Sequence, residues 1–347
     1  MPREQNRTTS IAVLEELIRI RRSYPGQGTA PNVHCDNETL AAIQLPKIRA
    51  FVEADKPIEF VLPAFPSKSP NPAKVLGRLP DLAEALSLSF LNAFCQRIQR
   101  HHPPGAKLTI CSDGRVFGDL IRVDDHDVSA YQNALHHLIA ETRAEHLSLY
   151  NLEHFTPQVG RTTNVDAMRE WLVDEYADPA ETLRNKLIND HAGTLLYRAI
   201  TRFLFEDGLT PDFRDSRTAL QKDSKIRALG VIQRSWAWGA LLAERFPNAL
   251  RLSIHPQPAT SQKIGIHLMP TRDDWLTPWH GVAVERNGRF TLMKRRAAEH
   301  LGGQIVTRNR RPSHYTIGSS APRPDAGDAR LLAATCAKAP AITPEAS

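Results

Sequence analysis

Short apolar runs alternate with longer amphipathic stretches through the first half of this 347-residue chain. The runs IEFVL at 58–62, KLTIC at 107–111 and HLSLY at 146–150 have the length and composition of buried strands. Apolar residues at helical spacing mark the segments at 81–98 and 128–145 that lie between them. Strands that alternate with helices form parallel βαβ units. The sequence therefore predicts an α/β fold built on a parallel sheet.

Helix-start signals place the remaining helices. Ser10 is expected to cap a helix over residues 10–22. Asp81 and Asp178 are each followed three residues later by a glutamate, which is the pattern of a capping box. The second box precedes a helical middle segment that continues into a helix at about 222–245.

Strand-like patterns return after residue 250, in the runs RLSIH, KIGIHL, HGVAVE and RFTLMK, with a hairpin expected at RNG. The basic run of Arg308, Arg310 and Arg311 beside Pro312 is predicted to be a loop at a solvated edge, with a binding patch as the alternative.

These patterns divide the chain into an N-terminal helix and linker at 1–32, an α/β domain at 33–310 with a helical insertion at about 160–246, and a tail at 319–347. The tail is rich in Ala, Pro and Ser, which predicts disorder. The chain has no apolar run of about 18 residues and no secretory signal pattern, so we expect a cytoplasmic protein without a membrane span.

The formal net charge of +6 is compatible with a nucleic acid or a small anion as partner. The aromatic residues are not interleaved with the basic ones as stacking platforms, which disfavours nucleic acid. Four scattered cysteines without a CxxC pair disfavour a zinc site and a disulfide framework, and Cys111 is predicted to be a core residue.

Ligands of open α/β sheets bind beyond the carboxyl ends of the strands, where three loops of this chain carry polar groups. The first, PAFPSKSPNPAK at 63–74, contains Lys68, Ser69, Asn71 and Lys74. Its prolines restrict the backbone, and its ammonium and hydroxyl donors suit a phosphate. It lacks the GxxxxGK[ST] pattern of a Walker loop.

The second loop, SDGRVFGDL at 112–120, begins with Ser112. Arg115 can bind a carboxylate or a phosphate through two parallel hydrogen bonds, and Asp113 or Asp119 can act as an acid or a base. A plain Asp-Gly turn is the structural alternative.

The third loop, RLSIHPQP at 251–258, begins with Arg251 and is followed by Lys263. His255 ends a strand directly before Pro256, which makes it an acid–base candidate, although a lone histidine is more often structural. There is no HExxH pattern and no GxGxxG pattern after a strand, so neither a metal nor a nicotinamide cofactor is expected.

Three motifs in these loops, FPSKSPN, SDGRVF and SIHPQP, are specific in combination and belong to a match that runs in order from about residue 40 to 295. With them the chain resembles the PvcA-like isonitrile synthases of the pyoverdine/dityrosine biosynthesis family. The resemblance implies a Rossmann-like sheet with helices on both faces and no cofactor. It also implies that the α-amine of an amino acid, commonly tyrosine or tryptophan, becomes an isonitrile with ribulose 5-phosphate as carbon donor. A separate iron and 2-oxoglutarate-dependent oxygenase is expected to act on the product.

That chemistry can be distributed over the candidate residues. His255 and Asp113 are predicted to be the acid–base groups, with Lys263 as an electrostatic partner. The predicted substrate-binding residues are Lys68, Ser69 and Lys74 for the sugar phosphate, Arg115 for a substrate anion, and Asn71, Ser112 and Arg251 beside them.

Two alternatives stay open. A phosphosugar lyase or transferase could use the same pocket without an amino acid, and turnover of ribulose 5-phosphate alone would favour it. Steep salt-dependent binding to generic DNA would favour a basic nucleic-acid-binding protein.

Overall fold

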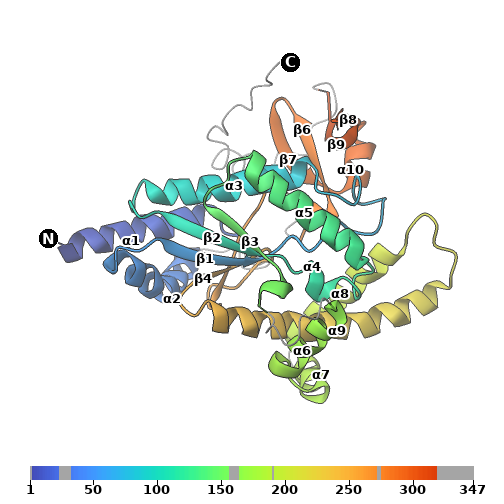
Figure 1. Ribbon diagram of the computed structural model, residues 1–347, viewed down its shortest axis with the longest axis horizontal. Coiled ribbons are helices and arrows are strands. Elements are labelled where there is room, and N and C mark those ends of the chain that lie inside the picture. Colours follow the sequence, from blue (N-terminus) through green and yellow to red (C-terminus); the bar gives the residue numbers. More distant parts are fainter. Residues whose placement is uncertain (1, 23–32, 156–163, 190, 272–274, 319–347) are drawn as a thin grey trace.

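The computed structural model describes residues 2–22, 33–155, 164–189, 191–271 and 275–318 (Figure 1). Within these residues, no helix is both long enough and apolar enough to cross a bilayer.

A five-stranded parallel sheet forms the centre of the molecule, in the order β3-β2-β1-β4-β5. The parallel α/β sheet predicted from the sequence is therefore confirmed. The chain moves outward from β1 to β2 and β3, and then returns to place β4 on the other side of β1. This topological switch between β1 and β4 is where ligands of such sheets bind. The strands are β1 (Ile58–Pro63), β2 (Ala106–Cys111), β3 (Leu147–Tyr150), β4 (Leu250–Ser253) and β5 (Lys263–Gly265).

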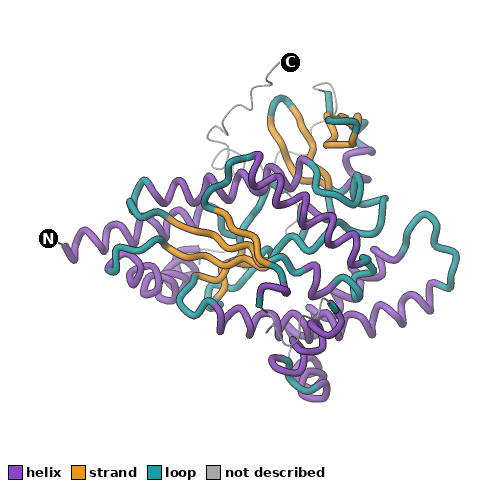
Figure 2. Tube along the Cα trace, in the orientation of Figure 1, coloured by secondary structure: helices purple, strands orange, loops and turns teal. Residues whose placement is uncertain are grey.

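Helices cover both faces of this sheet (Figure 2). On one face the larger core packs strand residues such as Phe60 and Ile110 against four helices. On the other face Val61 and Cys111 pack against Trp238 and the smaller core around it. The first group of helices is α1 (Pro2–Arg19), α2 (Val33–Glu53), α3 (Leu82–Gln99) and α5 (Asp125–Glu141); the second is α4 (Gly114–Phe117), α6 (Val165–Tyr176) and α9 (Arg217–Arg245). Two more helices, α7 (Ala180–Asn189) and α8 (His191–Gly208), precede α9 in the helical middle segment.

A second sheet of four strands, in the order β7-β6-β9-β8, lies at the top of the view in Figure 1. It packs on the first turn of α3 through Ala83 and Ala283. The predicted hairpin at Asn287 and Gly288 is present, and both residues have positive φ angles of 54° and 73°. The strands are β6 (Val282–Arg286), β7 (Arg289–Met293), β8 (Gln304–Arg308) and β9 (Arg311–Thr316), with α10 (Arg295–His300) between β7 and β8.

The basic run near the C-terminal end of this sheet is a hairpin, so its prediction as a loop was wrong. Arg308 ends β8 and Arg311 begins β9. Asn309 and Arg310 form the turn at φ angles of 49° and 63°. Pro312 has no backbone N–H to donate. It is tolerated because β9 pairs with β6 only at Tyr315 and Thr316, so no hydrogen bond to β6 is lost at the proline.

Two predicted helix starts were also wrong, whereas the third was confirmed. The capping box of Asp81 is present at α3. Ser10 lies inside α1, where its hydroxyl donates to the Asn6 carbonyl oxygen. Asp178 precedes α7, which begins at Ala180, and its carboxylate pairs with Lys186 at 2.6 Å instead of capping the helix.

Candidate active site

The loops after β1, β2 and β4 meet at the carboxyl edge of the central sheet. Phe65 follows β1 with a φ angle of 60° and packs its ring on Trp279, with centroids 5.2 Å apart. Strained backbone of this kind clusters at functional sites. Gly114, after β2, lies against the loop after β1, and a Cβ there would overlap the carbonyl oxygen of Pro66. The two loops are therefore packed backbone to backbone.

Lys68 is buried beneath this edge. Its ammonium group lies 2.8 Å from a carboxylate oxygen of Asp81 and 2.8 Å from one of Glu84, and donates to the Pro278 carbonyl oxygen at 3.2 Å. Burial opposes the charged ammonium, but the two carboxylates outweigh it and raise the pKa of Lys68. All three N–H donors are used within the protein. The geometry therefore favours a structural role over the predicted phosphate contact, which stays a prediction.

Ser69 and Asn71 tie the same loop to the end of α8. The Ser69 hydroxyl donates to Asp207 at 2.7 Å. The Asn71 amide donates to the carbonyl oxygens of Glu206 and Leu209, both at 2.9 Å. These bonds fix the loop and leave the Asn71 amide without a donor for a substrate.

A cluster of Lys74, Asp207 and His280 lies next to these residues. The Lys74 ammonium is 2.6 Å from Asp207 Oδ1, and His280 Nε2 is 3.7 Å from Asp207 Oδ2. The other ring nitrogen of His280 is 2.9 Å from the Thr277 hydroxyl. Burial would raise the pKa of Asp207, but His280 and Lys74 hold it below its ordinary value. The cluster joins a buried carboxylate to a histidine and a lysine that both remain partly exposed.

Of this cluster, sequence reasoning found Lys74 and missed Asp207 and His280. Asp207 lies near the end of α8, and His280 ends the short 3-10 helix Pro278–His280. Neither follows a strand of the central sheet, so the position of a residue after a strand did not point to either of them. The run TPWHG around His280 is the part of the sequence that could have indicated it.

His255 lies two residues beyond β4, with its side chain exposed to water. Its ring packs on that of Trp275, with centroids 5.5 Å apart. Desolvation by the surrounding protein, followed by the charges of Arg22, His280 and Lys263, lowers the pKa of His255 to about 4. Water that reaches the ring screens part of this effect. His255 is therefore an accessible imidazole that stays neutral at pH 7.

Arg22 holds the two segments that carry His255 and Trp275. Its buried guanidinium donates to the Ile254 carbonyl oxygen at 2.7 Å and to that of Leu276 at 3.5 Å. Since each carbonyl belongs to a residue adjacent to one of the two rings, this arginine fixes their relative position.

Arg251 and Lys263 lie on neighbouring strands and are paired in register. One guanidinium nitrogen of Arg251 donates to the Gly239 carbonyl oxygen of α9 at 2.8 Å. Burial, with the charge of Arg251 as a smaller cause, lowers the pKa of Lys263 to about 8. Lys263 is close enough to His255 to lower its pKa as well.

Asp113, Ser112 and Arg115 lie on the other side of β1. Burial raises the pKa of Asp113 to about 7. The Ser112 hydroxyl donates to the Phe65 carbonyl oxygen at 2.8 Å. Since β1 separates β2 from β4, Asp113 and His255 leave strands about 10 Å apart. The described residues show no contact between the two, so the structure does not pair His255 with Asp113; the charges of His280 and Lys263 act on His255 instead.

Arg115 is engaged within the protein by all three guanidinium nitrogens. It donates to Glu153 at 2.7 Å, to the Asp125 carbonyl oxygen at 2.9 Å and to the Ser129 hydroxyl at 2.8 Å. This set of bonds favours a structural role, and the predicted contact with a substrate anion stays a prediction. Within the described part of the chain, no group of three His, Cys, Asp or Glu side chains could hold a metal ion.

A parallel α/β sheet that gathers histidine, aspartate and lysine side chains at its topological switch has the arrangement of an enzyme acting on small polar substrates. The comparisons with known proteins give the family. The model of the pyoverdine/dityrosine biosynthesis protein family matches residues 48–306, and the chain belongs to this family.

The relatives agree with this assignment. The chain is 57% identical to the L-tyrosine isonitrile synthase of Pseudomonas aeruginosa, over 91% of this chain and 96% of that protein. It is 53% identical to the L-tyrosine isonitrile synthase of Xenorhabdus nematophila, over 90% and 93%. A crystal structure of the PvcA protein from Pseudomonas aeruginosa has a TM-score of 0.85 and 58% identity, and the match covers 89% of this chain and 99% of that one. Because such relatives are named as isonitrile synthases, the chain is an enzyme.

Proposed function

We propose that this protein is an isonitrile synthase that converts the α-amine of L-tyrosine to an isonitrile and takes the new carbon from ribulose 5-phosphate. The observation that carries the proposal is the similarity to two L-tyrosine isonitrile synthases over nine-tenths of the chain. The L-tryptophan isonitrile synthase AmbI2 of Fischerella ambigua is 41% identical, over 90% of this chain and 92% of that protein, and supports the same reaction on a second aromatic amino acid.

The reaction needs several proton transfers. A neutral amine attacks the ketone carbon of the sugar phosphate, and loss of water gives an imine. The imine then loses a proton and eliminates phosphate, and both carbon–carbon bonds of the former ketone carbon break, which leaves that carbon on nitrogen alone. Positioned bases and acids accelerate such steps, and cations stabilise the charges that develop.

The two histidines of the site suit these transfers. The lowered pKa of His255 keeps its imidazole neutral at pH 7, so the ring can accept the proton that the nitrogen loses after it has attacked the ketone. Thr277 and Asp207 orient His280, which can return a proton to a later intermediate. Lys74 lies against the same carboxylate and adds a partly exposed positive charge.

An apolar surface for the amino acid's ring lies beside His255. Trp275 is 46% exposed although its ring packs on the histidine. Exposed aromatic rings at a site offer stacking area for an aromatic substrate. This arrangement supports tyrosine or tryptophan over an aliphatic amino acid.

The purified protein is expected to form tyrosine isonitrile from L-tyrosine and ribulose 5-phosphate. Mass spectrometry with a sugar that carries labelled carbon at the ketone position should find the label in the isonitrile group. Reactions with each amino acid in turn, and with the sugar phosphate alone, serve as controls. Consumption of ribulose 5-phosphate at the same rate without an amino acid would contradict the proposal and favour a phosphosugar lyase.

Two further expectations from the sequence analysis stay predictions. One is a separate iron and 2-oxoglutarate-dependent oxygenase that consumes the isonitrile. The other is a cytoplasmic location.

A further inference from the structure

Two cations converge beneath α9. Arg251 and Lys263 alternate along their strands with Leu252 and Ile264, which pack in the core of the opposite face. Both basic side chains therefore face α9. A Cβ built on Gly239 of that helix would lie 3.4 Å from Arg251 Nη2 and 3.9 Å from Lys263 Nζ. The two positively charged ends thus point at the same spot, and the helix presents no side chain there.

No negative charge compensates this pair within the described part of the chain. Acidic groups contribute nothing to the pKa of either side chain, and burial lowers both. The other cations around the site differ, since Lys68 and Lys74 both pair with carboxylates.

Half-buried like charges repel one another, and an anion bound between them removes the repulsion. Both side chains are partly exposed, so a solute can reach them. A dianionic phosphate accepts hydrogen bonds from a guanidinium and an ammonium together.

The position of Arg251 and Lys263 relative to His255 connects the two cations with the proposed reaction. The loop from β4 to β5 carries His255 between the two cations in sequence, and the charge of Lys263 acts on its pKa. An anion held by the pair is therefore within electrostatic reach of the imidazole.

We propose that Arg251 and Lys263 form the phosphate site of the enzyme and hold the phosphate of the sugar substrate while its ketone carbon lies at His255. This inference rests on the proposed function for the identity of the sugar, but not for the binding of the phosphate group. It places the phosphate at β4 and β5, and not at the loop after β1.

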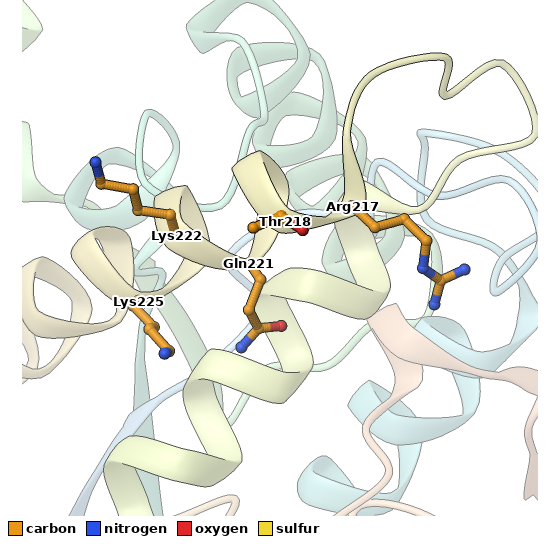
Figure 3. A pocket seen from close by; sticks show the side chains of 5 residues that line it. All are labelled: Arg217, Thr218, Gln221, Lys222 and Lys225. Atoms are coloured by element: carbon orange, nitrogen blue, oxygen red, sulfur yellow. The ribbon is translucent and has the colours of Figure 1, made fainter.

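A second basic region shows what such a site requires. A hollow of about 350 Å³ lies along the first turns of α9 and is lined by Arg217, Lys222 and Lys225 together with Thr218 and Gln221 (Figure 3). Its three cations point in different directions. They lie on the exposed first turns of a single helix and do not converge on one point, so we assign no anion to them.

Steady-state kinetics of the Lys263→Gln variant test the proposal. Loss of one charge-assisted phosphate contact is expected to raise the KM for ribulose 5-phosphate about 10- to 100-fold. The KM for tyrosine should change less than about 2-fold, and Lys263→Arg should restore most of the affinity. Lys107→Gln is the matched control, because Lys107 is an exposed lysine on the same face of the sheet. An equal rise in both KM values, or none, would overturn the inference.

Binding without catalysis separates this inference from the proposed function. Phosphorus NMR titrations with ribulose 5-phosphate, without an amino acid, should show binding by the wild type and by Lys107→Gln, and at least 10-fold weaker binding by Lys263→Gln. If this pattern appears while no isonitrile forms, the phosphate site stands and the proposed function fails. If isonitrile forms and Lys263→Gln binds the sugar phosphate like the wild type, the phosphate site is wrong. Melting curves identify any variant that has lost its fold, and if Lys263→Gln has done so, Arg251→Gln replaces it in the comparison.

Discussion

Replacement of His255 by alanine is expected to lower kcat about 10²- to 10⁴-fold while the melting temperature stays within a few degrees. The reason is the position of this imidazole, exposed at the carboxyl end of β4 with Lys263 and His280 nearby. A surface position carries little stability, so the loss should appear in turnover and not in folding. His126→Ala is the matched control, since the His126 side chain is 93% exposed and distant in sequence from the site.

The pH profile gives the same prediction a second readout. A base works only in its neutral form, and His255 remains neutral down to about pH 4 because its pKa is lowered. The activity that depends on it should therefore persist below pH 6.5, the ordinary pKa of histidine, and fall as the pH approaches the lowered value. Near-wild-type turnover by His255→Asn would mean that the ring is structural.

Replacement of Lys68 by methionine is expected to reduce the free energy of unfolding by about 3–5 kcal/mol, because it leaves two buried carboxylates without their cation. Urea unfolding measures this loss. Lys186→Met is the matched control. Its ion pair with Asp178 is equally short but exposed on both sides, so its loss should cost less than about 1 kcal/mol.

The destabilisation should depend on pH. Burial raises the pKa of Glu84 to about 7 even with Lys68 present, so the folded state binds a proton more tightly than the unfolded chain does. The stability that the proton on Glu84 contributes is complete below about pH 4.5, the pKa of this carboxyl in the unfolded chain. It is lost as the pH rises through 7, the pKa in the folded protein. The variant should therefore lose least near pH 5 and most above pH 7. If Lys68→Met instead has a much higher KM for the sugar phosphate and unchanged stability, Lys68 is a phosphate ligand and not a structural residue.

The central sheet could be predicted because its strands are compact apolar runs buried on at least one face. The helix α2 carries Pro46 in its interior, and this breaker weakened its helical pattern. The strands β8 and β9 escaped prediction for a different reason. Most of β8 is exposed, and β9 begins with two exposed residues followed by the mainly polar run Ser313, His314, Tyr315 and Thr316, so both lack the apolar alternation of half-buried strands.

The candidate site contains some residues that the sequence predicts and others that only the tertiary fold brings together. His255 could be proposed because it follows the carboxyl end of β4, and Lys263 because it comes directly after the same loop, at the start of β5. Arg115 looked equally suitable, but its carboxylate partner Glu153 lies 38 residues away and satisfies it internally. Asp207 comes from the end of a helix 133 residues beyond Lys74. Pairings at such separations depend on the tertiary fold, which a single sequence does not display.

The segment that follows α1 protects the sheet against self-association. Arg21 pairs with Ile266 in an antiparallel bridge, the Arg22 N–H donates to the Gly265 carbonyl oxygen at 2.7 Å, and the His267 N–H donates to Ile20 at 2.9 Å. Unpaired edge strands recruit strands from other molecules and promote aggregation. A chain shortened to begin at residue 33 would therefore expose the edge of β5 and lose Arg22 in one step, so its failure would combine precipitation with a disordered site.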